Sequence, residues 1–328
     1  MFKKRKEKIL ITGGSGFIAT HLIKYLQTFD KYEITVLDIV PPKTENVKFI
    51  QASISDLSKI EPILNDIDYV FNFAAMIGVD NCANNPDAVM QVNYVDTKNL
   101  FDLCVKKCIK KIIFTSSSEV YGNSEDIPYK ENAILQPIST YAKCKMMIEG
   151  YLMGISKTTK IKVGIVRFFN VYGLGQKDDF VSSIFVKAAL TNEPLVIFGD
   201  GQQSRCFTYV DDAVKGVYSL FKYNKSPYEI VNIGSKFEST IENLAKIVLS
   251  SIPESKSKIV FKNYGIDNVR ESYLEIKRRI PFTDKANRLL GFEAVTSIED
   301  GVKNIAFSYV KEINTHDYFE DGRILSSN

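Results

Sequence analysis

The sequence predicts an α/β fold, in which a doubly wound parallel sheet is followed by a smaller C-terminal α/β lobe. The first half of the chain alternates short apolar strands with amphipathic helices, the pattern of a parallel sheet covered on both faces. After about residue 170 this alternation loosens, and glycines such as Gly173, Gly175 and Gly199 punctuate the chain. We therefore expect a cofactor domain over residues 1–170 and a substrate lobe over residues 171–328. Segments around 207–233 are expected to return to the first sheet.

The apolar periodicity places each element. In the first half it predicts strands at 8–12, 33–37, 47–50, 68–73, 111–115 and 162–167. The helices of this half are expected near 16–28, 59–65, 86–109 and 139–157. In the second half it predicts helices near 180–191, 211–223, 240–250 and 283–290, with a strand near 195–198. Residues 260–282 are expected to form strands and loops.

Composition excludes several classes of protein. The 328 residues carry 42 basic and 39 acidic side chains, a balance that argues against a nucleic-acid partner. No run approaches the ~18 apolar residues of a membrane helix, and the basic run at 3–6 lacks the apolar stretch of a signal peptide. Two histidines and five cysteines without a Cys-x-x-Cys pair argue against a metal site or a Ser-His-Asp triad. We expect a cytoplasmic protein with reduced thiols.

A glycine-rich turn follows the first strand. In Ile9-Leu-Ile-Thr-Gly-Gly-Ser-Gly-Phe-Ile-Ala19, Gly13 permits a sharp turn and Gly16 permits close approach of a pyrophosphate to the start of a helix. Asp38 ends the next strand, where a carboxylate binds an adenosine ribose and repels a 2′-phosphate. An ordinary strand–turn–helix is the alternative, but the spacing favours a Rossmann-type site for NAD over NADP.

A second constellation pairs Tyr141 with Lys145, four residues apart on one helical face. A lysine ammonium stabilises a phenolate, so this pair predicts a tyrosine that acts as a base near neutral pH. Ser117 ends the preceding predicted strand and is placed to bind a substrate oxygen.

With these motifs, the chain resembles the extended short-chain dehydrogenase/reductase family, in its nucleotide-sugar epimerase/dehydratase branch. The resemblance spans nearly the whole chain. Its longest motifs are Thr12–Ile18, Arg167–Gly173 and Gly199–Asp212. The chain departs from the family pattern where Ala19 and Asp96 replace glycine and where Ser53 and Cys206 replace aspartate.

The resemblance assigns roles to individual residues. It implies cofactor contacts from Gly13, Gly16, Phe17, Ile18, Asp38, Ile39, Ser53, Ile54, Phe73, Ala74, Ala75, Asn93, Thr115, Tyr141, Lys145 and Phe168. It implies substrate contacts from Ser117, Ser118, Asn170, Phe180, Phe198, Arg205 and Arg270. Asn170 and Arg205 would hold the pyrophosphate of a nucleotide sugar, because a guanidinium binds this anion bidentately. Arg270 is the weaker second candidate.

The implied chemistry begins with oxidation of a sugar at C4. Tyr141 would remove the 4-hydroxyl proton, Lys145 would lower the pKa of Tyr141, and Ser117 would bind the reacting oxygen. The resulting 4-keto sugar is expected to be re-reduced as its 4-epimer. Glu119 keeps two alternatives open, 4,6-dehydration and decarboxylation of a uronate. In a 4,6-dehydratase it would serve as the base on C5, and nucleotide-uronate decarboxylases often read Thr-Ser-Glu where this chain has Ser117-Ser118-Glu119. Ser118 stands before Glu119 in place of the aspartate that would protonate a leaving hydroxyl.

Two further expectations complete the prediction. A non-catalytic NAD-binding scaffold or redox sensor is the alternative from another class, although such a protein needs none of Tyr141, Lys145 and Ser117. The resemblance also implies a homodimer that pairs through the helices near 86–109 and 139–157.

Overall fold

Seven parallel strands form the centre of the computed structural model, which describes residues 5–177, 180–263 and 277–321. Their order across the sheet is β11-β6-β5-β4-β1-β2-β3, and every neighbouring pair is parallel. The order reverses between β1 and β4, which is the switch point where ligands bind in such sheets. This sheet confirms the predicted Rossmann-type α/β fold.

The elements of the first sheet alternate along the chain. Its strands are β1 Glu7–Thr12, β2 Tyr32–Asp38, β3 Lys48–Gln51, β4 Tyr69–Asn72, β5 Lys111–Ser117, β6 Lys162–Phe168 and β11 Tyr228–Ile233. The helices around it are α1 Phe17–Gln27, α2 Leu57–Leu64, α3 Val79–Asn84, α4 Pro86–Met90, α5 Thr97–Lys106, α6 Thr140–Thr158, α8 Val210–Lys222 and α10 Asp284–Leu290.

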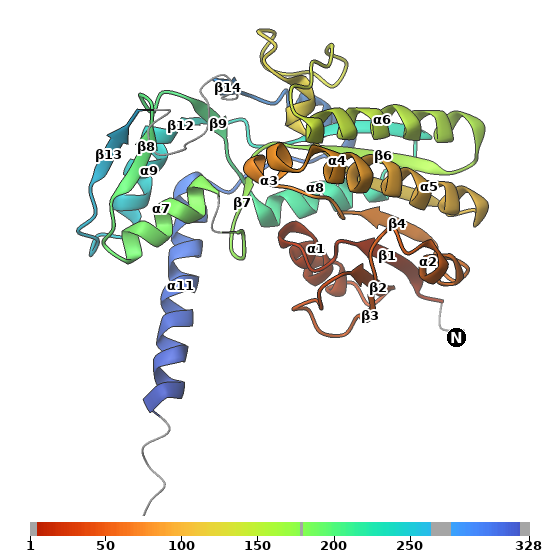
Figure 1. Ribbon diagram of the computed structural model, residues 1–328, viewed down its shortest axis with the longest axis horizontal. Coiled ribbons are helices and arrows are strands. Elements are labelled where there is room, and N and C mark those ends of the chain that lie inside the picture. The colour runs from red at the N-terminus through yellow and green to blue at the C-terminus, as the bar shows by residue number, and fades with distance from the viewer. Residues whose placement is uncertain (1–4, 178–179, 264–276, 322–328) are drawn as a thin grey trace, which may run out of the picture.

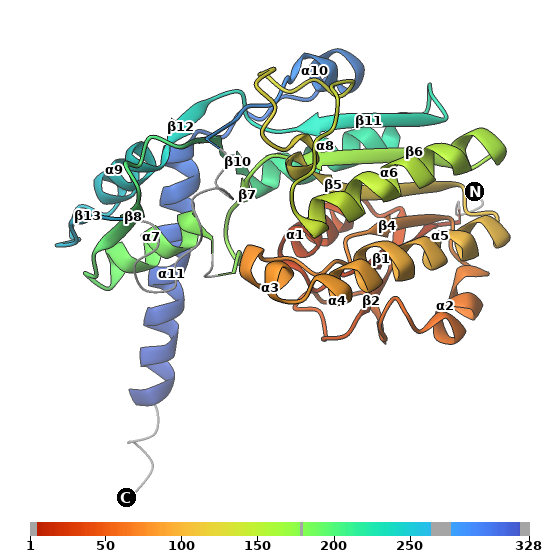
Figure 2. The same ribbon diagram turned by 45° about the horizontal axis from the view of Figure 1, so that its top comes forward.

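Helices cover both faces of this sheet (Figure 1 and Figure 2). One face buries the apolar sides of α1, α8 and α10 in a single core cluster. The other face buries α2, α5 and α6 in a second cluster. Because both faces are covered, the ends of the strands are the places where polar chemistry can meet solvent.

The C-terminal lobe has its own core, built around α7 Val181–Leu190, α9 Ile241–Ser251 and the first turns of α11 Ile298–Asp321. The strands of this lobe are β7 Val171–Tyr172, β8 Leu195–Phe198, β9 Ser204–Cys206, β10 Thr208–Tyr209, β12 Glu238–Thr240, β13 Ile259–Lys262 and β14 Arg278–Arg279. They pair as β10-β7, β12-β9-β14 and β13-β8. The helix α11 extends away from the rest of the fold (Figure 1).

The helical stretch predicted near 86–109 is confirmed from Pro86 to Lys106, but it is not a uniform α-helix. Pro86 begins α4, the π-helical segment η1 spans Gln91–Asp96, and α5 follows it. The wider turn is held by side chains: Thr97 Oγ1 donates to the Val92 carbonyl at 3.0 Å, five residues back. A π-helical turn inside a helix often marks a functional position, and here it carries Asn93.

In the part of the chain that the structure describes, no helix is long and apolar enough to cross a membrane. The same residues contain no group of three or more histidine, cysteine or acidic side chains that could hold a metal ion.

Candidate active site

The glycine turn after β1 packs against the chain that follows β4. Gly13 has a φ of +68°, and a Cβ atom at this position would lie 2.5 Å from the backbone nitrogen of Ala74. Only glycine therefore lets the turn lie so close to Phe73 and Ala74. Gly16 is the N-cap of α1 and supplies no capping side chain, so the first N–H groups of the helix stay available to an anion.

Asp38 joins the same turn from the end of β2. Its carboxylate accepts hydrogen bonds from Ser15 N at 2.9 Å and from Val40 N at 3.3 Å. Ile39 beside it is 65% exposed. The carboxylate predicted to bind a ribose is thus fixed next to the glycine turn.

Three residues predicted to contact the cofactor, Asn93, Ile54 and Ser53, make contacts within the protein itself. Asn93 uses its amide on the backbone of Met76, with Met76 N donating to Oδ1 at 2.7 Å and Nδ2 donating to the Met76 carbonyl at 2.9 Å. It therefore positions the segment after β4, which contains Ala75. Ile54 is 3% exposed and packs in the core beside α2, whereas Ser53 Oγ accepts a hydrogen bond from Ser55 N.

Lys145 in α6 is buried against the carboxyl end of β5. The residue is 3% exposed, and its ammonium donates to the Thr115 carbonyl at 2.7 Å and lies 4.7 Å from the centroid of the Phe114 ring. Burial lowers the pKa of Lys145 to about 8. Thr115 Oγ1 donates in turn to the Asn72 carbonyl at 3.0 Å.

Tyr141 lies one helical turn before Lys145, whose ammonium is 5.6 Å from the centroid of the tyrosine ring. Burial raises the pKa of Tyr141 above its ordinary value, and the nearby charge of Glu119 raises it further. A hydrogen bond with Ser117 and the positive charge of Arg279 act in the opposite direction. The structure thus differs from the expectation that Lys145 sets this pKa, because its ammonium is directed to Thr115.

The segment after β5 supplies the other polar groups. Ser117 Oγ caps the short 3₁₀ helix η2 Ser118–Tyr121 by accepting from Glu119 N at 3.2 Å. The Glu119 carboxylate accepts a hydrogen bond from Ser139 Oγ at 3.2 Å, and Ser139 is the N-cap of α6. Ser118 is only 1% exposed, which leaves little surface for the predicted substrate contact.

The predicted substrate residues come from both lobes. Asn170 follows β6 with a φ of 40°, and its buried Oδ1 has no hydrogen-bond partner among the described residues. Arg205 is 9% exposed in β9 and donates to the Ser204 carbonyl at 2.7 Å. Phe198 ends β8 half-buried, and Phe180 is 38% exposed at the start of α7.

Sequence reasoning missed Arg279. Arg270 lies outside the described residues, whereas Arg279 lies in β14 directly opposite Arg205 in β9. Its buried Nε has no hydrogen-bond partner among the described residues, and its charge lowers the pKa of Tyr141. The double arginine before Ile280 was the available signal, but only the pairing of β14 with β9 brings Arg279 to the site.

A buried ion pair lies behind the catalytic segment. Arg167 in β6 donates from Nε and Nη2 to Glu149 in α6 at 3.0 and 2.6 Å. Arg167 Nη1 also donates to Tyr121 Oη at 2.8 Å, and Ser116 Oγ donates to Glu149 at 2.5 Å. The pair therefore anchors both ends of the segment that contains Ser117 and its neighbours.

The residues at the switch point fit a dinucleotide. The uncapped start of α1 suits a pyrophosphate, and Asp38 stands beside it at the end of the next strand, where an adenosine ribose would lie. Lys145 and Tyr141 stand at the carboxyl end of β5, on the opposite side of the switch point. The two groups therefore lie on either side of the switch point, where such folds bind a dinucleotide.

Comparisons with known proteins agree with this geometry. Residues 9–234 match the family described as "NAD dependent epimerase/dehydratase family". The chain is 34% identical to a UDP-N-acetyl-alpha-D-glucosaminuronate decarboxylase of Bacillus cytotoxicus, over 91% of this chain and 96% of that protein. It is 32% identical to a putative UDP-glucose 4-epimerase of Methanocaldococcus jannaschii, over 90% and 96% of the two chains.

Solved structures show the same likeness. The crystal structure of a UDP-glucose 4-epimerase from Thermotoga maritima, with UDP-glucose, superposes with a TM-score of 0.86 at 29% identity and covers 93% of this chain and 99% of its own. A UDP-glucuronic acid 4-epimerase from Bacillus cereus, in complex with UDP-glucuronic acid and NAD, gives 0.83 at 28% identity with the same coverage. The chain belongs to the NAD-dependent epimerase/dehydratase family and is an NAD-dependent enzyme of its nucleotide-sugar epimerase, dehydratase and decarboxylase group.

Proposed function

We propose that the protein is a nucleotide-sugar 4-epimerase that acts through a transient 4-keto sugar. NAD, held by the start of α1 and by Asp38, would supply a reversible hydride acceptor for C4. Ser117 binds the reacting oxygen, and Tyr141 takes and returns the proton of the 4-hydroxyl. Because burial and Glu119 raise the pKa of Tyr141, the phenolate needs positive charge nearby, and Arg279 supplies it. Asn170, Arg205 and Arg279 bind the diphosphate of the substrate.

The residue before Glu119, Ser118, is the observation that favours a 4-epimerase over a 4,6-dehydratase. A 4,6-dehydration needs a base on C5 and an acid that protonates the leaving 6-hydroxyl. The chain places Glu119 close enough to Tyr141 to affect its pKa, but the neighbouring position holds Ser118, which is buried and has no carboxyl group. Epimerisation needs neither of these two groups, since one tyrosine moves the proton in both directions.

A nucleotide-uronate decarboxylase is the second candidate, and Arg279 is the observation that favours it. Loss of CO₂ from a 4-keto uronate needs no acid for a leaving hydroxyl, but it does need a group that holds the substrate carboxylate. A guanidinium whose buried Nε is unsatisfied among the described residues suits that task. The likeness to a decarboxylase that acts on a uronate is consistent with this candidate.

Product analysis distinguishes these reactions. The purified enzyme is incubated separately with UDP-glucose, UDP-N-acetylglucosamine, UDP-glucuronic acid and dTDP-glucose, and the products are followed by mass spectrometry and NMR. We expect a product of unchanged mass with inverted configuration at C4. Loss of one CO₂ from UDP-glucuronic acid would replace the proposal with the decarboxylase, and loss of one water would replace it with the dehydratase.

Substitution of Glu119 tests the same assignment within the site. In a 4-epimerase, Glu119→Gln should keep kcat within about tenfold of wild type, because Glu119 transfers no proton. As the base of a dehydratase, the same change would cost about 10²–10⁴-fold. Glu125→Gln, which alters an exposed glutamate in the loop after η2, is the matched control. A loss above about 10²-fold with Glu119→Gln alone would contradict the epimerase.

A further inference from the structure

A pocket lies at the amino ends of the central strands, on the opposite side of the sheet from the active site at their carboxyl ends. It has a volume of about 670 Å³ and is lined by the beginnings of β4, β5 and β6 together with the end of α8. The active site lies at the carboxyl ends of the same strands, so the two sites are separated by the length of the sheet. Most small-molecule sites have volumes of about 300–1,000 Å³, and this pocket falls within that range.

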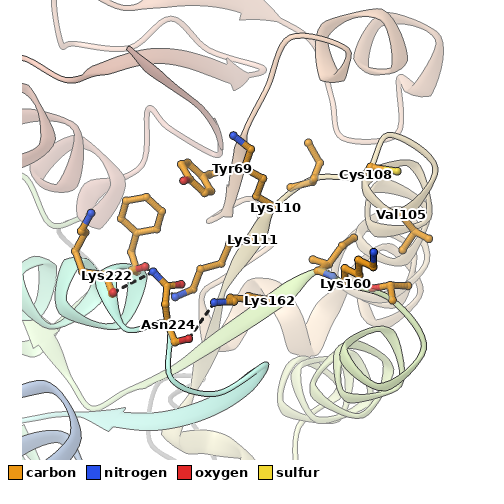
Figure 3. Close-up of a pocket in the computed structure, with 13 residues that line it drawn as sticks. Tyr69, Val105, Cys108, Lys110, Lys111, Lys160, Lys162, Lys222 and Asn224 are labelled. Atoms are coloured by element: carbon orange, nitrogen blue, oxygen red, sulfur yellow. Dashed lines mark hydrogen bonds between the residues drawn. The ribbon is translucent and has the colours of Figure 1, made fainter. Parts of the chain in front are cut away.

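Five lysines line this pocket, and none of its lining residues is acidic. The lysines come from three parts of the chain (Figure 3), with Lys110 and Lys111 at the start of β5, Lys160 and Lys162 at the start of β6, and Lys222 at the end of α8. Like charges that converge on one cavity repel one another, and an anion relieves that repulsion.

The partners of these lysines show which of them are available to a ligand. Lys111 is 4% exposed, and its ammonium donates to the carbonyls of Leu220, Phe221 and Tyr223, which uses all three of its N–H groups. Lys110 pairs with Asp68 at 2.7 Å. These two lysines contribute positive charge but have few free donors.

The other three lysines line the pocket and have no carboxylate partner among the described residues. Within the described part of the chain, no acidic side chain lies within ion-pair distance of Lys160, Lys162 or Lys222. Lys162 donates once, to the Asn224 carbonyl at 2.9 Å, and keeps two further N–H groups (Figure 3). Lys160 and Lys222 are exposed, and no hydrogen bond of their ammonium groups is seen among the described residues.

We propose that this pocket is a second ligand site, which binds a small molecule carrying at least two phosphate groups. Several ammonium groups that act as separate point charges suit the clustered charges of a diphosphate. The apolar wall formed by Tyr69, Ile161 and Phe221 accommodates an organic group attached to the phosphates. Burial, with a smaller contribution from the charges of Lys162 and Lys222, lowers the pKa of Lys111 to about 7.

Cys108 offers a local measurement of occupancy. It lines the pocket and is exposed, whereas the other four cysteines are buried. The full-length protein is alkylated with iodoacetamide, a neutral reagent, with and without inorganic pyrophosphate, and modification of Cys108 is quantified by peptide mass spectrometry. At about four times the Kd, pyrophosphate should slow the reaction about fivefold, as mass action requires.

Variants and anions then test the assignment. Protection of Cys108 by pyrophosphate should be lost in the double variant Lys160→Gln/Lys222→Gln. If this variant does not fold, the two single variants are measured instead, and each should show weaker protection than the wild type. Lys256→Gln/Lys258→Gln removes two exposed charges from the other lobe and should keep full protection. Unchanged protection in the Lys160/Lys222 variant, equal protection by chloride at the same ionic strength, or equal protection by orthophosphate would overturn the proposal. The readout involves no nucleotide sugar, so it is independent of the proposed reaction.

Discussion

The buried pair of Glu149 and Arg167 leads to the most quantitative prediction. Both side chains are almost fully buried, and two hydrogen bonds join them. Glu149→Leu leaves the guanidinium buried without its counter-ion. Breaking a buried pair from one side costs about 3–5 kcal/mol of unfolding free energy. We expect a loss of this size, because Tyr121 and the Glu131 carbonyl are the only other acceptors that Arg167 has among the described residues.

The expected loss translates into a measurable change in the unfolding temperature. Unfolding entropy is about 2.1 cal/mol/K per residue, or about 0.7 kcal/mol/K for this chain. The midpoint should therefore fall by about 4–7 °C. Equilibrium unfolding in urea gives the free energy, and a thermal melt followed by circular dichroism gives the midpoint.

A double variant separates the charge effect from simple loss of packing. In Glu149→Leu/Arg167→Met both charges are replaced by apolar groups of similar volume, a change that is often close to neutral for buried pairs. The double variant should therefore be more stable than Glu149→Leu alone. A loss below about 1 kcal/mol in the single variant, or a double variant as unstable as the sum of its singles, would refute this account.

Three further predictions concern the cofactor side of the site. Tyr141→Phe should abolish hydride transfer, measured as the transient absorbance of reduced cofactor in a single turnover, while NAD still binds by calorimetry; wild-type turnover would remove Tyr141 from the mechanism. Asp38→Ala should bring the Kd values for NAD and NADP closer together, and an unchanged ratio would assign the preference to other residues. The depressed pKa of Lys145, about 8, means that the unfolded state binds more protons between about pH 8 and 10.5, so its contribution to stability rises with pH. From pH 7.5 to 9.5 the wild type should gain about 1–2 kcal/mol relative to Lys145→Met in urea unfolding, and parallel curves would contradict this.

Local sequence patterns were sufficient for the sheet and its cofactor turn. The strands of the first half are continuous apolar runs because both faces of the sheet are covered, and such runs can be read without knowledge of their neighbours. Asp38 and Gly13 follow from their spacing along one strand–turn–helix–strand unit. The π-helical turn inside the helical stretch 86–109 could not be read in this way, since periodicity does not reveal the bond from Thr97 Oγ1 to the Val92 carbonyl that accompanies the wide turn.

The substrate side depended more on contacts between distant segments. Arg279 is 74 residues from Arg205, and the two meet because β14 pairs with β9 in parallel. No periodicity within one element indicates such a pairing. Arg270 was chosen by resemblance in a loop that aligns poorly, and this choice stays a prediction because the residue lies outside the described part of the chain.

The pair of Tyr141 and Lys145 shows what the spacing of two residues on a helix can and cannot predict. Four residues on a helix predict that the two side chains share a face, and the ammonium does lie 5.6 Å from the centroid of the tyrosine ring. The spacing does not predict where that ammonium points. The Thr115 carbonyl, 30 residues earlier at the end of β5, binds it, while Glu119 adds negative charge beside the phenol. The charge balance at Tyr141 is therefore set by the ends of neighbouring elements, so a change at Glu119 should shift the pKa of this tyrosine although Glu119 does not belong to the Tyr–Lys motif.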